Sequence, residues 1–495
     1  MESTGSTSMQ RAFLRHVFRT RCIMKEKSDE KRDIESGVHD IVEEILHAVG
    51  QTNPEFQFSK ILPSGSFYEG TKIGCLNEFD YMVVLKTLSS PDAVLLHNGC
   101  SQWYKKVQLQ SSNESFQTYL LHCHTTSHLY TNYFGNRELF VLDFWRKIAE
   151  TLKAKTYIVE KQSGKIAADL NPLHLKQKLY FNYEKNFYIP EVDPNYTVKN
   201  PLVPIENTVI GVDLMMAIEH PNPDEVVSCS DFPSEFKDLL FQRGCHIITK
   251  SCHIDHFPAP TCMFISFAAM ELELMVKMDD HHKETYKILK SLLIGENDLS
   301  RKCMNVSSYV LKTAFLFHVY GKNKCLDSKL HVPCIHDVLD YLSSSLYNMK
   351  MPTFFARSQN TWGYILEVPC FAWPEFKTRF PTHAELTFTF ALCWVKLWHT
   401  IIKYIKATIV ETSNLGQDQW MGVIDKCEYM KRTTYYILER YKSSALREVF
   451  QGTLSSSDLA DKNLSLCSDE LFVEYVEKME EYHNIKLRFL LFQKR

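Results

Sequence analysis

The sequence carries almost no net charge and has no long hydrophobic run. Its 56 Lys and Arg residues are nearly balanced by 59 Asp and Glu residues, which gives a formal net charge of -3. A global basic excess is therefore excluded, so any nucleic-acid binding must depend on a local patch. The most apolar stretch, residues 386–401, is interrupted by Lys396 and His399 and falls short of the ~20 apolar residues that a membrane span needs. We expect no membrane association.

The fifteen cysteines form no dense framework of short spacings, and their number is odd. The first residues also lack the apolar core of a signal peptide. Both features favour a reducing, cytoplasmic location. Possible zinc ligands gather at one place, but without a C-x2-C pair, so buried free cysteines are the preferred interpretation and no structural zinc is expected. This group comprises Cys245, His246, Cys252, His253, His256 and Cys262.

The pattern of apolar residues changes along the chain. Residues 1–9 are predicted to form a flexible tail. From residue 10 to about 49 there is no proline, and in the second half of this stretch apolar residues recur at helical spacing. A mixed first half then leads into a helical second half, so we predict the α+β class. The strand-like runs are residues 56–62, 80–85 and 208–218; the helical ones are 140–153, 264–278, 286–293, 308–320, 386–410 and a segment starting at Ser468.

The most informative segment is PSGSFYEGTKIGCLNEFDYMVVL, residues 63–85. Gly65 allows a close approach of the backbone to a ligand, and backbone N–H groups beside Ser64 and Ser66 are suited to phosphate oxygens. Because side chains alternate along a strand, Glu78 and Asp80 project from the same face. Two carboxylates this close repel each other unless a cation neutralises them, and oxygen ligands favour Mg²⁺ or Mn²⁺.

A third carboxylate would complete a two-metal site. Asp213 is the best candidate, because it is the one acid inside the apolar run VIGVDLMMAI. A buried carboxylate is costly unless it is paired or bound to metal. The alternative is a turn and a solvated strand edge, which is the common meaning of each feature taken alone. The order and spacing of the features together are far more specific.

This combination resembles the cyclic GMP–AMP synthase-like (Mab-type) branch of the nucleotidyltransferase superfamily. The resemblance spans roughly residues 10–350. It implies a two-lobed fold with a catalytic lobe at residues 10–225, which begins with a long N-terminal helix, and a mainly helical lobe with a C-terminal extension at residues 226–495. The matching segments are GSFYEGTKI, NEFDYMVVL, the strand around Asp213, FISFAAMELELM, YKILKSLL and SSYVLKTAFLFH.

The resemblance also implies roles for individual residues. Gly65 and Ser66 would hold phosphates, and Glu78, Asp80 and Asp213 would be the catalytic metal ligands. Further residues would contact the nucleotides: Lys290 and Ser308 their phosphates, Tyr309 a base, and Ser266 and Glu271 the surrounding pocket. For Lys290 and Tyr309 the alternatives are a solvated charge and a helix-packing residue.

Two departures from the family pattern affect the expected activity. The vertebrate synthase has a zinc ribbon between the segments that match Met275 and Tyr286, but here the interval VKMDDHHKET contains no cysteine. In addition, Phe264 aligns with an Arg that helps to read a purine, and a Phe side chain donates no hydrogen bond. We therefore expect altered base choice.

Basic residues give a candidate nucleic-acid surface. Arg11, Arg15 and Arg19 would share one helix face, while Lys176 and Lys178 alternate with aromatic residues. The alternative is an ordinary solvated face. Since relatives without the ribbon include RNA sensors, the resemblance favours double-stranded RNA as the activator.

The leading hypothesis is a cytoplasmic, antiviral enzyme of innate immunity. It would join ATP and a second NTP into a cyclic dinucleotide for a downstream receptor. Two alternatives remain, namely a catalytically silent Mab-type scaffold protein and an oligoadenylate-type synthase that makes linear products.

Overall fold

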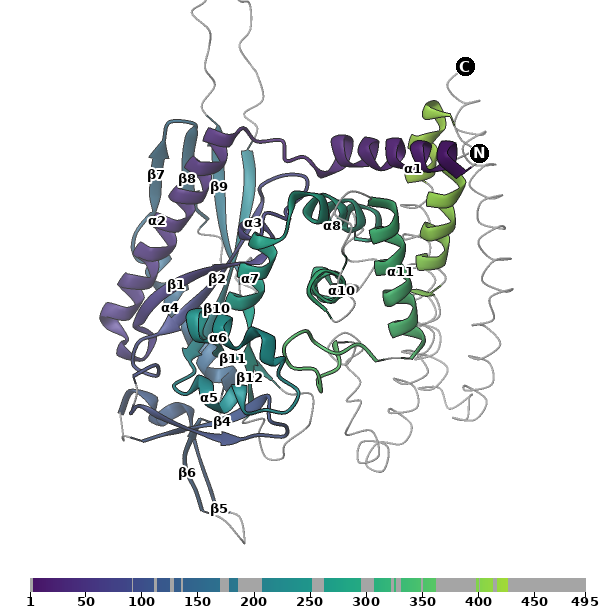
Figure 1. Ribbon diagram of the computed structural model, residues 1–495. Coiled ribbons are helices and arrows are strands. Elements are labelled where there is room, and N and C mark those ends of the chain that lie inside the picture. Colours follow the sequence, from purple (N-terminus) through teal and green to yellow (C-terminus); the bar gives the residue numbers. More distant parts are fainter. Residues whose placement is uncertain are drawn as a thin grey trace, which may run out of the picture. The chain divides into compact units, whose positions relative to one another are not determined.

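The computed structural model divides into two compact units (Figure 1). The sheet unit is Met24–Lys277, and the helical unit combines Met1–Ile23 with Met278–Arg495. The structure describes residues 3–90, 92–110, 114–124, 129–134, 137–169, 178–185, 207–251, 262–294, 307–321, 325, 331–348, 350–361, 398–399, 401–412 and 416–425.

Twelve strands of the described residues form one sheet, with the path β5-β6-β4-β12-β11-β10-β9-β8-β7; β1 pairs with β2, β2 with β10, and β3 with β4. Every pairing is antiparallel except that of β2 with β10. The predicted α+β class is confirmed. The strands are β1 (Phe58–Ser64), β2 (Glu78–Leu85), β3 (Val94–Asn98), β4 (Tyr104–Leu109), β5 (Leu120–His124), β6 (Leu129–Phe134), β7 (Ile158–Lys161), β8 (Gly164–Ala168), β9 (Leu179–Lys185), β10 (Asn207–Glu219), β11 (His246–Ser251) and β12 (Cys262–Ser266).

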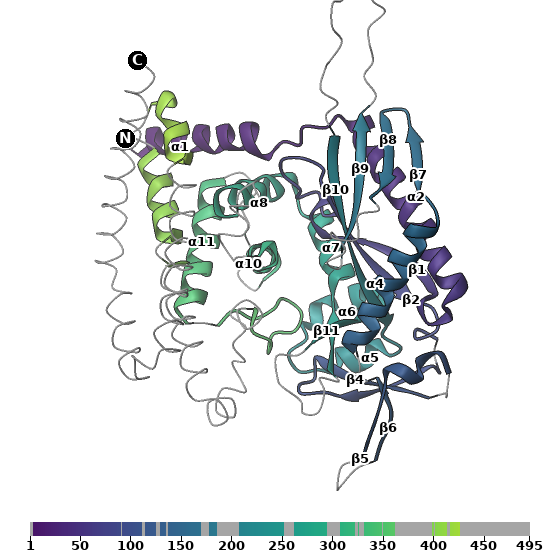
Figure 2. The same cartoon turned by 180° about the vertical axis from the view of Figure 1, so that it is seen from behind.

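The helices of the sheet unit cover this sheet. Helix α2 (Ser28–Thr52) lies against β7, β8 and α4 (Arg137–Ala154), as the two opposite views in Figures 1 and 2 show. It packs there because its apolar residues recur every three or four positions and are almost fully buried: Ile34, Val38, Ile41, Val42, Ile45, Leu46 and Val49. The shorter helices are α3 (Gly65–Tyr68), α5 (Pro223–Val227), α6 (Lys237–Arg243) and α7 (Ala268–Lys277), with 3-10 turns at Pro54–Phe56, Glu114–Tyr119 and Ser234–Phe236.

The helical unit contains α1 (Ser3–Val17), the π-helical turn Phe18–Cys22, α8 (Asp280–Leu293), α10 (Ser308–Tyr320) and α11 (His331–Tyr347). Residues 401–411 and 420–425 are also helical. Helix α1 belongs to this unit because Phe13 packs edge-on against Trp420 and Arg21 forms an ion pair with Asp425. The helix predicted from Ser468 lies outside the described residues.

The prediction of a single long N-terminal helix is wrong. Helix α1 already begins at Ser3, within the stretch predicted to be a flexible tail, and the chain leaves helical geometry between Cys22 and Ser28. Tertiary hydrogen bonds replace the helical ones in this gap. The Glu26 carboxylate accepts a bond from the Leu76 amide at 2.7 Å, and the Lys25 amide donates to the Gly74 carbonyl at 3.3 Å.

Along the chain, the sheet unit ends at Lys277 and the helical unit resumes at Met278. The predicted boundary between the lobes, at residues 225 and 226, therefore lies within the sheet unit. The reason is that β11 and β12 extend the sheet by pairing with β10 and β4. The helix expected over residues 264–278 is accordingly two elements, the end of β12 and helix α7. Among the described residues, no helix is long and apolar enough to cross a membrane.

Candidate active site

Two neighbouring strands, β2 and β10, bring the predicted acids together. In the parallel pair β2–β10, Asp80 lies opposite Asp213 and Glu78 lies opposite Gly211. On the other edge of β2, Ser64 lies opposite Asp80. Residues paired in register project to the same face, so Ser64, Asp80 and Asp213 form one row across the sheet, with Glu78 beside it. The structure thus unites the acids that the sequence places 133 residues apart.

The backbone at Gly65 lies directly against this row. Gly65 has a φ of 76°, and a Cβ atom built there would lie 1.9 Å from Asp80 Oδ2. The chain then makes one helical turn, α3, which is closed by a 2.9 Å hydrogen bond from the Thr71 amide to the Ser66 carbonyl. Only glycine combines this left-handed conformation with such a close approach.

Lys178 bridges two of the acids. Its Nζ atom lies 2.7 Å from Glu78 Oε1 and 3.0 Å from Asp213 Oδ2. The β9–β10 ladder pairs Leu179 with Val212, so the preceding Lys178 falls beside Asp213. Its side chain crosses Gly211, where an added Cβ would lie 2.3 Å from Lys178 Cε. Lys178 was predicted to contact nucleic acid, but the structure places its ammonium group within the acidic cluster.

A second lysine was missed by the sequence analysis. Lys72 is 2% exposed, and its Nζ lies 3.5 Å from Glu78 Oε2. The pattern that indicates it is a lone lysine within the glycine-rich segment that leads to Glu78. We define the acidic cluster as Glu78, Asp80 and Asp213, with Lys72 and Lys178 as its partners.

The cluster retains an excess of negative charge. Burial raises the pKa of Asp80 to about 7, with further contributions from the charges of Glu78 and Asp213, while Lys178 and Lys72 act in the opposite direction. Burial also raises the pKa of Asp213. Burial would lower the pKa of Lys178, but its contacts with Glu78 and Asp213 outweigh this effect and raise it. Three carboxylates facing two ammonium groups fit the oxygen-rich, anionic environment that Mg²⁺ prefers.

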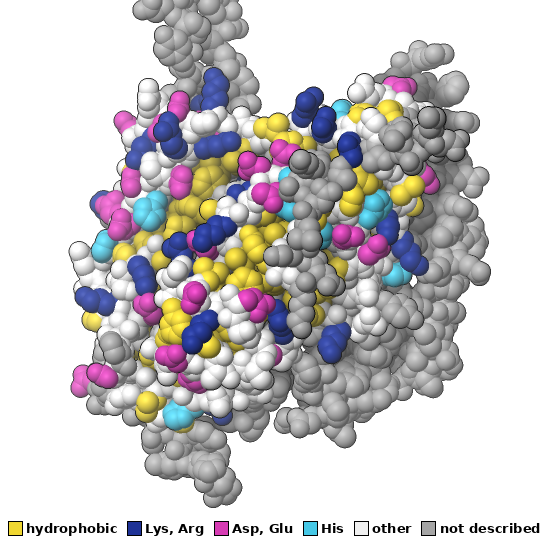
Figure 3. Space-filling view, viewed as in Figure 1, with side chains coloured by type: hydrophobic (Ala, Val, Ile, Leu, Met, Phe, Trp, Pro, Cys, Tyr) yellow, Lys and Arg dark blue, Asp and Glu magenta, His cyan; other side chains and the backbone are white. Residues whose placement is uncertain are grey.

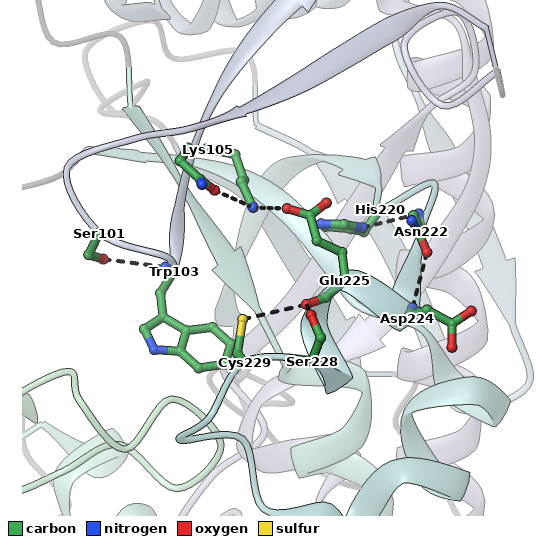
Figure 4. A network of polar contacts seen from close by, with 10 residues as sticks. Ser101, Trp103, Lys105, His220, Asn222, Asp224, Glu225, Ser228 and Cys229 are labelled. Atoms are coloured by element: carbon green, nitrogen blue, oxygen red, sulfur yellow. Dashed lines mark hydrogen bonds and ion pairs between the residues drawn. The ribbon is translucent and has the colours of Figure 1, made fainter.

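A polar network elsewhere in the sheet unit, in which positive and negative charges balance, contrasts with the acidic cluster (Figure 4). Lys105, which is buried, forms an ion pair with Glu225 and donates to Asn98 Oδ1 at 3.0 Å. Nearby, burial lowers the pKa of His220 to about 4, and its Nδ1 accepts a hydrogen bond from the Asn222 amide. Here one ammonium group meets one carboxylate, so no further cation is needed.

Two other predicted site residues lie in the sheet unit. Ser266 ends β12 and its Oγ accepts a 3.3 Å hydrogen bond from the Ala268 amide. Glu271 is buried on α7, and α7 packs against β1 and α3. The helix that carries Glu271 therefore supports the turn that contains Gly65.

Lys290, Ser308 and Tyr309 belong to the helical unit. Lys290 is buried on α8, which packs against α10. Ser308 begins α10, where its carbonyl accepts a 3.2 Å hydrogen bond from the Tyr286 hydroxyl. The Lys312 ammonium lies 5.4 Å from the centre of the Tyr309 ring. Tyr309 is half-buried and Ser308 is exposed.

The predicted basic face is only partly formed. Arg15 and Arg19 are exposed, but Arg11 is half-buried, and Arg19 lies in the π-helical turn rather than in α1. Lys176 lies outside the described residues. Over the part of the sheet unit visible in Figure 3, basic and acidic side chains are intermixed.

Comparison with models of known protein families gives no match for this chain. The assignment of function must therefore follow from the chemistry of the acidic cluster and from the sequence resemblance.

Proposed function

We propose that this protein is a Mg²⁺- or Mn²⁺-dependent nucleotidyltransferase that joins ATP and a second NTP into a cyclic dinucleotide. The observation that carries the proposal is the register of β2 and β10, which sets Asp80 beside Asp213 and next to Glu78. An excess of carboxylates on adjacent central strands is costly to maintain for structure alone, because like charges at this distance repel. This cost argues against a catalytically silent scaffold.

Glu78, Asp80 and Asp213 are the residues that would hold the metal ions. Bound there, divalent cations would lower the pKa of the attacking hydroxyl and stabilise the charge on the leaving oxygens. In the proposed reaction, a ribose hydroxyl oxygen bonds to the α-phosphorus of the other nucleotide. The bond from that phosphorus to pyrophosphate breaks, and the hydroxyl proton is released. A second transfer closes the ring.

The chain's own groups would position the substrates. The Gly65 turn offers backbone amides and the Ser66 hydroxyl to the phosphates, at a place where its backbone already lies against Asp80. Lys72 and Lys178 restrain the carboxylates before substrate arrives, since both contact Glu78. Holding reactants in line accounts for much of the rate acceleration in such transfers.

The direct test supplies the purified full-length protein with pairs of labelled NTPs, Mg²⁺ or Mn²⁺, and either duplex RNA, duplex DNA or no nucleic acid. We expect release of pyrophosphate and a product that resists phosphatase because it has no free terminal phosphate. A phosphatase-sensitive product would indicate a linear synthase. Absence of any transfer under all conditions would contradict the proposal and favour the scaffold alternative.

We further propose that double-stranded RNA activates the enzyme in an antiviral, cytoplasmic pathway. Support comes from exposed Arg15 and Arg19 and from the absence of a zinc ribbon in the interval after Met275. A-form duplexes are bound through phosphates and 2′-hydroxyls, which requires exposed basic side chains rather than base readout.

The test of activation changes both arginines to glutamate. Arg15→Glu with Arg19→Glu should abolish stimulation by duplex RNA, whereas the matched pair Arg32→Glu with Arg146→Glu, both exposed in the sheet unit, should not. Equal activity with RNA, DNA and no nucleic acid would contradict the proposal. So would undiminished stimulation of the Arg15 and Arg19 variant.

Base choice is expected to be relaxed or altered. Phe264 lies in β12 with 9% exposure, and its ring centre is 5.3 Å from that of Tyr104. Such an aromatic side chain supplies no hydrogen bond to distinguish guanine. Competition among the four NTPs should therefore yield products that include a pyrimidine beside adenine. Exclusive formation of cyclic GMP–AMP would contradict this expectation.

A further inference from the structure

Four possible metal ligands converge in the helical unit, and none of them has been assigned a role above. His282 lies on α8, His318 on α10, Cys325 on the segment after α10, and Cys334 on α11. One ligand atom from each residue lies within 4.8 Å of all the others. We call this group the His/Cys cluster. Among the residues that the structure describes, it is the one group of nitrogen and sulfur ligands close enough together to hold a metal ion.

Two of the distances within the cluster are close to those of a tetrahedral zinc site. Cys325 Sγ and Cys334 Sγ are 3.7 Å apart, and Cys334 Sγ lies 3.8 Å from His282 Nε2. Zinc at about 2.3 Å from each sulfur and about 2.0 Å from nitrogen would place two sulfurs about 3.8 Å apart and sulfur about 3.5 Å from nitrogen. At this sulfur–sulfur distance no disulfide joins Cys325 and Cys334. His281 Nε2 also lies 3.9 Å from Cys334 Sγ, at the margin of the cluster.

His282 is oriented as metal-bound histidines are. His282 Nδ1 lies 2.6 Å from Asp279 Oδ2, which leaves Nε2 directed at the cluster. His318 Nδ1 lies 4.0 Å from Asp337 Oδ2, which is too far for a hydrogen bond, so only His282 has this support. A carboxylate on the far nitrogen fixes the ring and increases the basicity of the nitrogen that binds metal.

One buried nitrogen in the cluster is without a hydrogen-bond partner. Within the described part of the chain, His318 Nε2 has no hydrogen-bond partner, although the side chain is only 8% exposed. A buried polar atom without a partner costs about 1–3 kcal/mol. A metal ion bound by Nε2 removes that cost, which gives a second observation, independent of the distances, that points to a ligand.

The backbone also holds the cluster together. The Cys325 amide donates a 3.0 Å hydrogen bond to the His318 carbonyl, which fixes the cysteine beside the end of α10. Helices α8, α10 and α11 pack against one another around this point. A single ion bound to all four side chains would therefore cross-link three helices and the segment between two of them.

We propose that the His/Cys cluster binds one structural Zn²⁺ ion that stabilises the helical unit. Two thiolates and two imidazoles, three of them on packed helices and with no coordination position left open, are typical of structural rather than catalytic zinc. The proposal replaces the expectation of no structural zinc. It also differs from a zinc ribbon, because only His282 falls in the interval 276–285 and the other three ligands come from later elements.

The first test measures metal in the full-length protein, purified without chelator and with Zn²⁺ present during expression. Elemental analysis should find one zinc per chain. Cys334→Ser and His318→Gln should lose it, while the matched changes Cys229→Ser and His47→Gln in the sheet unit should keep it. Absence of zinc in the wild type, or full retention of zinc in both cluster variants, would overturn the proposal.

A second test needs no variant and so does not depend on whether a mutant folds. Substitution with Co²⁺ should give the intense near-ultraviolet bands of sulfur-to-cobalt charge transfer together with the visible spectrum of a tetrahedral ion. Two additional thiols should become reactive toward alkylation after chelation, but not after treatment with a thiol-free reductant. Release of the two thiols by the reductant alone would identify a disulfide and overturn the proposal.

Asp279 is a positioning residue, and its variant separates metal binding from helix capping. The other oxygen of its carboxylate, Oδ1, accepts a 3.0 Å bond from the His282 amide, and Asn can keep this cap. Asp279→Asn should weaken zinc binding about 10–100-fold. Asp280→Asn, an exposed neighbour, should leave the affinity unchanged. Equal affinities in the two variants would show that Asp279 does not orient the ligand.

Discussion

The acidic cluster of the sheet unit and the His/Cys cluster of the helical unit are both convergent groups of ionisable side chains, but they differ in donor chemistry and exposure. The acidic cluster offers hard oxygen donors and stays accessible, with side-chain exposures of 28% for Glu78 and 44% for Asp213. The His/Cys cluster offers nitrogen and sulfur, and its His282 and Cys334 are almost fully buried.

This difference separates a site suited to turnover from one suited to stability. Oxygen ligands on an accessible face of the sheet allow metal ions to enter and leave with phosphates, as Mg²⁺ does. Thiolates and imidazoles enclosed by helices retain zinc, and its binding free energy contributes directly to folding. If the two clusters act independently, a change in one leaves the metal binding of the other intact.

The largest expected effect is the loss of catalysis when the acidic cluster loses charge. Asp80→Asn combined with Glu78→Gln should reduce product formation at least about a hundredfold, because metal binding contributes several kcal/mol to the transition state. The zinc content should remain one per chain, since the His/Cys cluster is unchanged. Wild-type turnover in the double variant would refute the assignment of the metal site.

Gly65 gives the next largest effect and has a matched control. Gly65→Ala forces both a left-handed alanine and a Cβ atom 1.9 Å from Asp80 Oδ2, so we expect destabilisation of at least about 3 kcal/mol and loss of activity. Gly70 has a similar φ of 70°, but a Cβ there meets nothing within 4 Å. Gly70→Ala should therefore cost only about 1–2 kcal/mol, as denaturant unfolding of both variants can show.

A moderate effect concerns pH and Mg²⁺. The raised pKa of Asp80 means that the folded protein keeps a proton that the unfolded chain loses, so stability should fall as pH rises from about 4 to about 7 and then level off. Mg²⁺ should raise the melting temperature at pH 8 in the wild type. Asp80→Asn should remove both the pH dependence and the response to Mg²⁺, with bound zinc held constant.

The smallest effect concerns Lys178, which competes with cations for Glu78 and Asp213. Lys178→Met should increase the apparent Mg²⁺ affinity about fivefold, since a partly exposed ion pair contributes about 1 kcal/mol. Lys86→Met, at an exposed position, serves as the control. An unchanged affinity measured by calorimetry would show that the lysine does not oppose metal binding.

Local sequence patterns were sufficient to predict several elements of the fold and the shared orientation of two of the three acids. The apolar stripe of α2 and the strand β2 were predicted because burial of one face imposes a period on the sequence. The same alternation places Glu78 and Asp80 on one face. Helix α10 was predicted with its observed limits, since Ser308–Tyr320 is rich in apolar residues and contains neither proline nor glycine.

Other features were not predictable from local pattern. The break between Cys22 and Ser28 depends on hydrogen bonds to Gly74 and Leu76, and nothing in the residues themselves stops a helix there. Residues 264–266 read as helical, yet they complete β12 because the edge of β11 was available for pairing. Tertiary contacts override local preference in both places.

The sequence by itself determined that Glu78 and Asp80 share a face, that Gly65 precedes them in a flexible turn, and that Asp213 is an acid within an apolar strand. Only the tertiary structure decided that Asp213 lies opposite Asp80 and that Lys178 joins Asp213 to Glu78, because strand register is fixed by pairing between distant segments. The His/Cys cluster depends on tertiary structure throughout. Its ligands show no recognisable spacing, because three packed helices rather than a short loop bring them together.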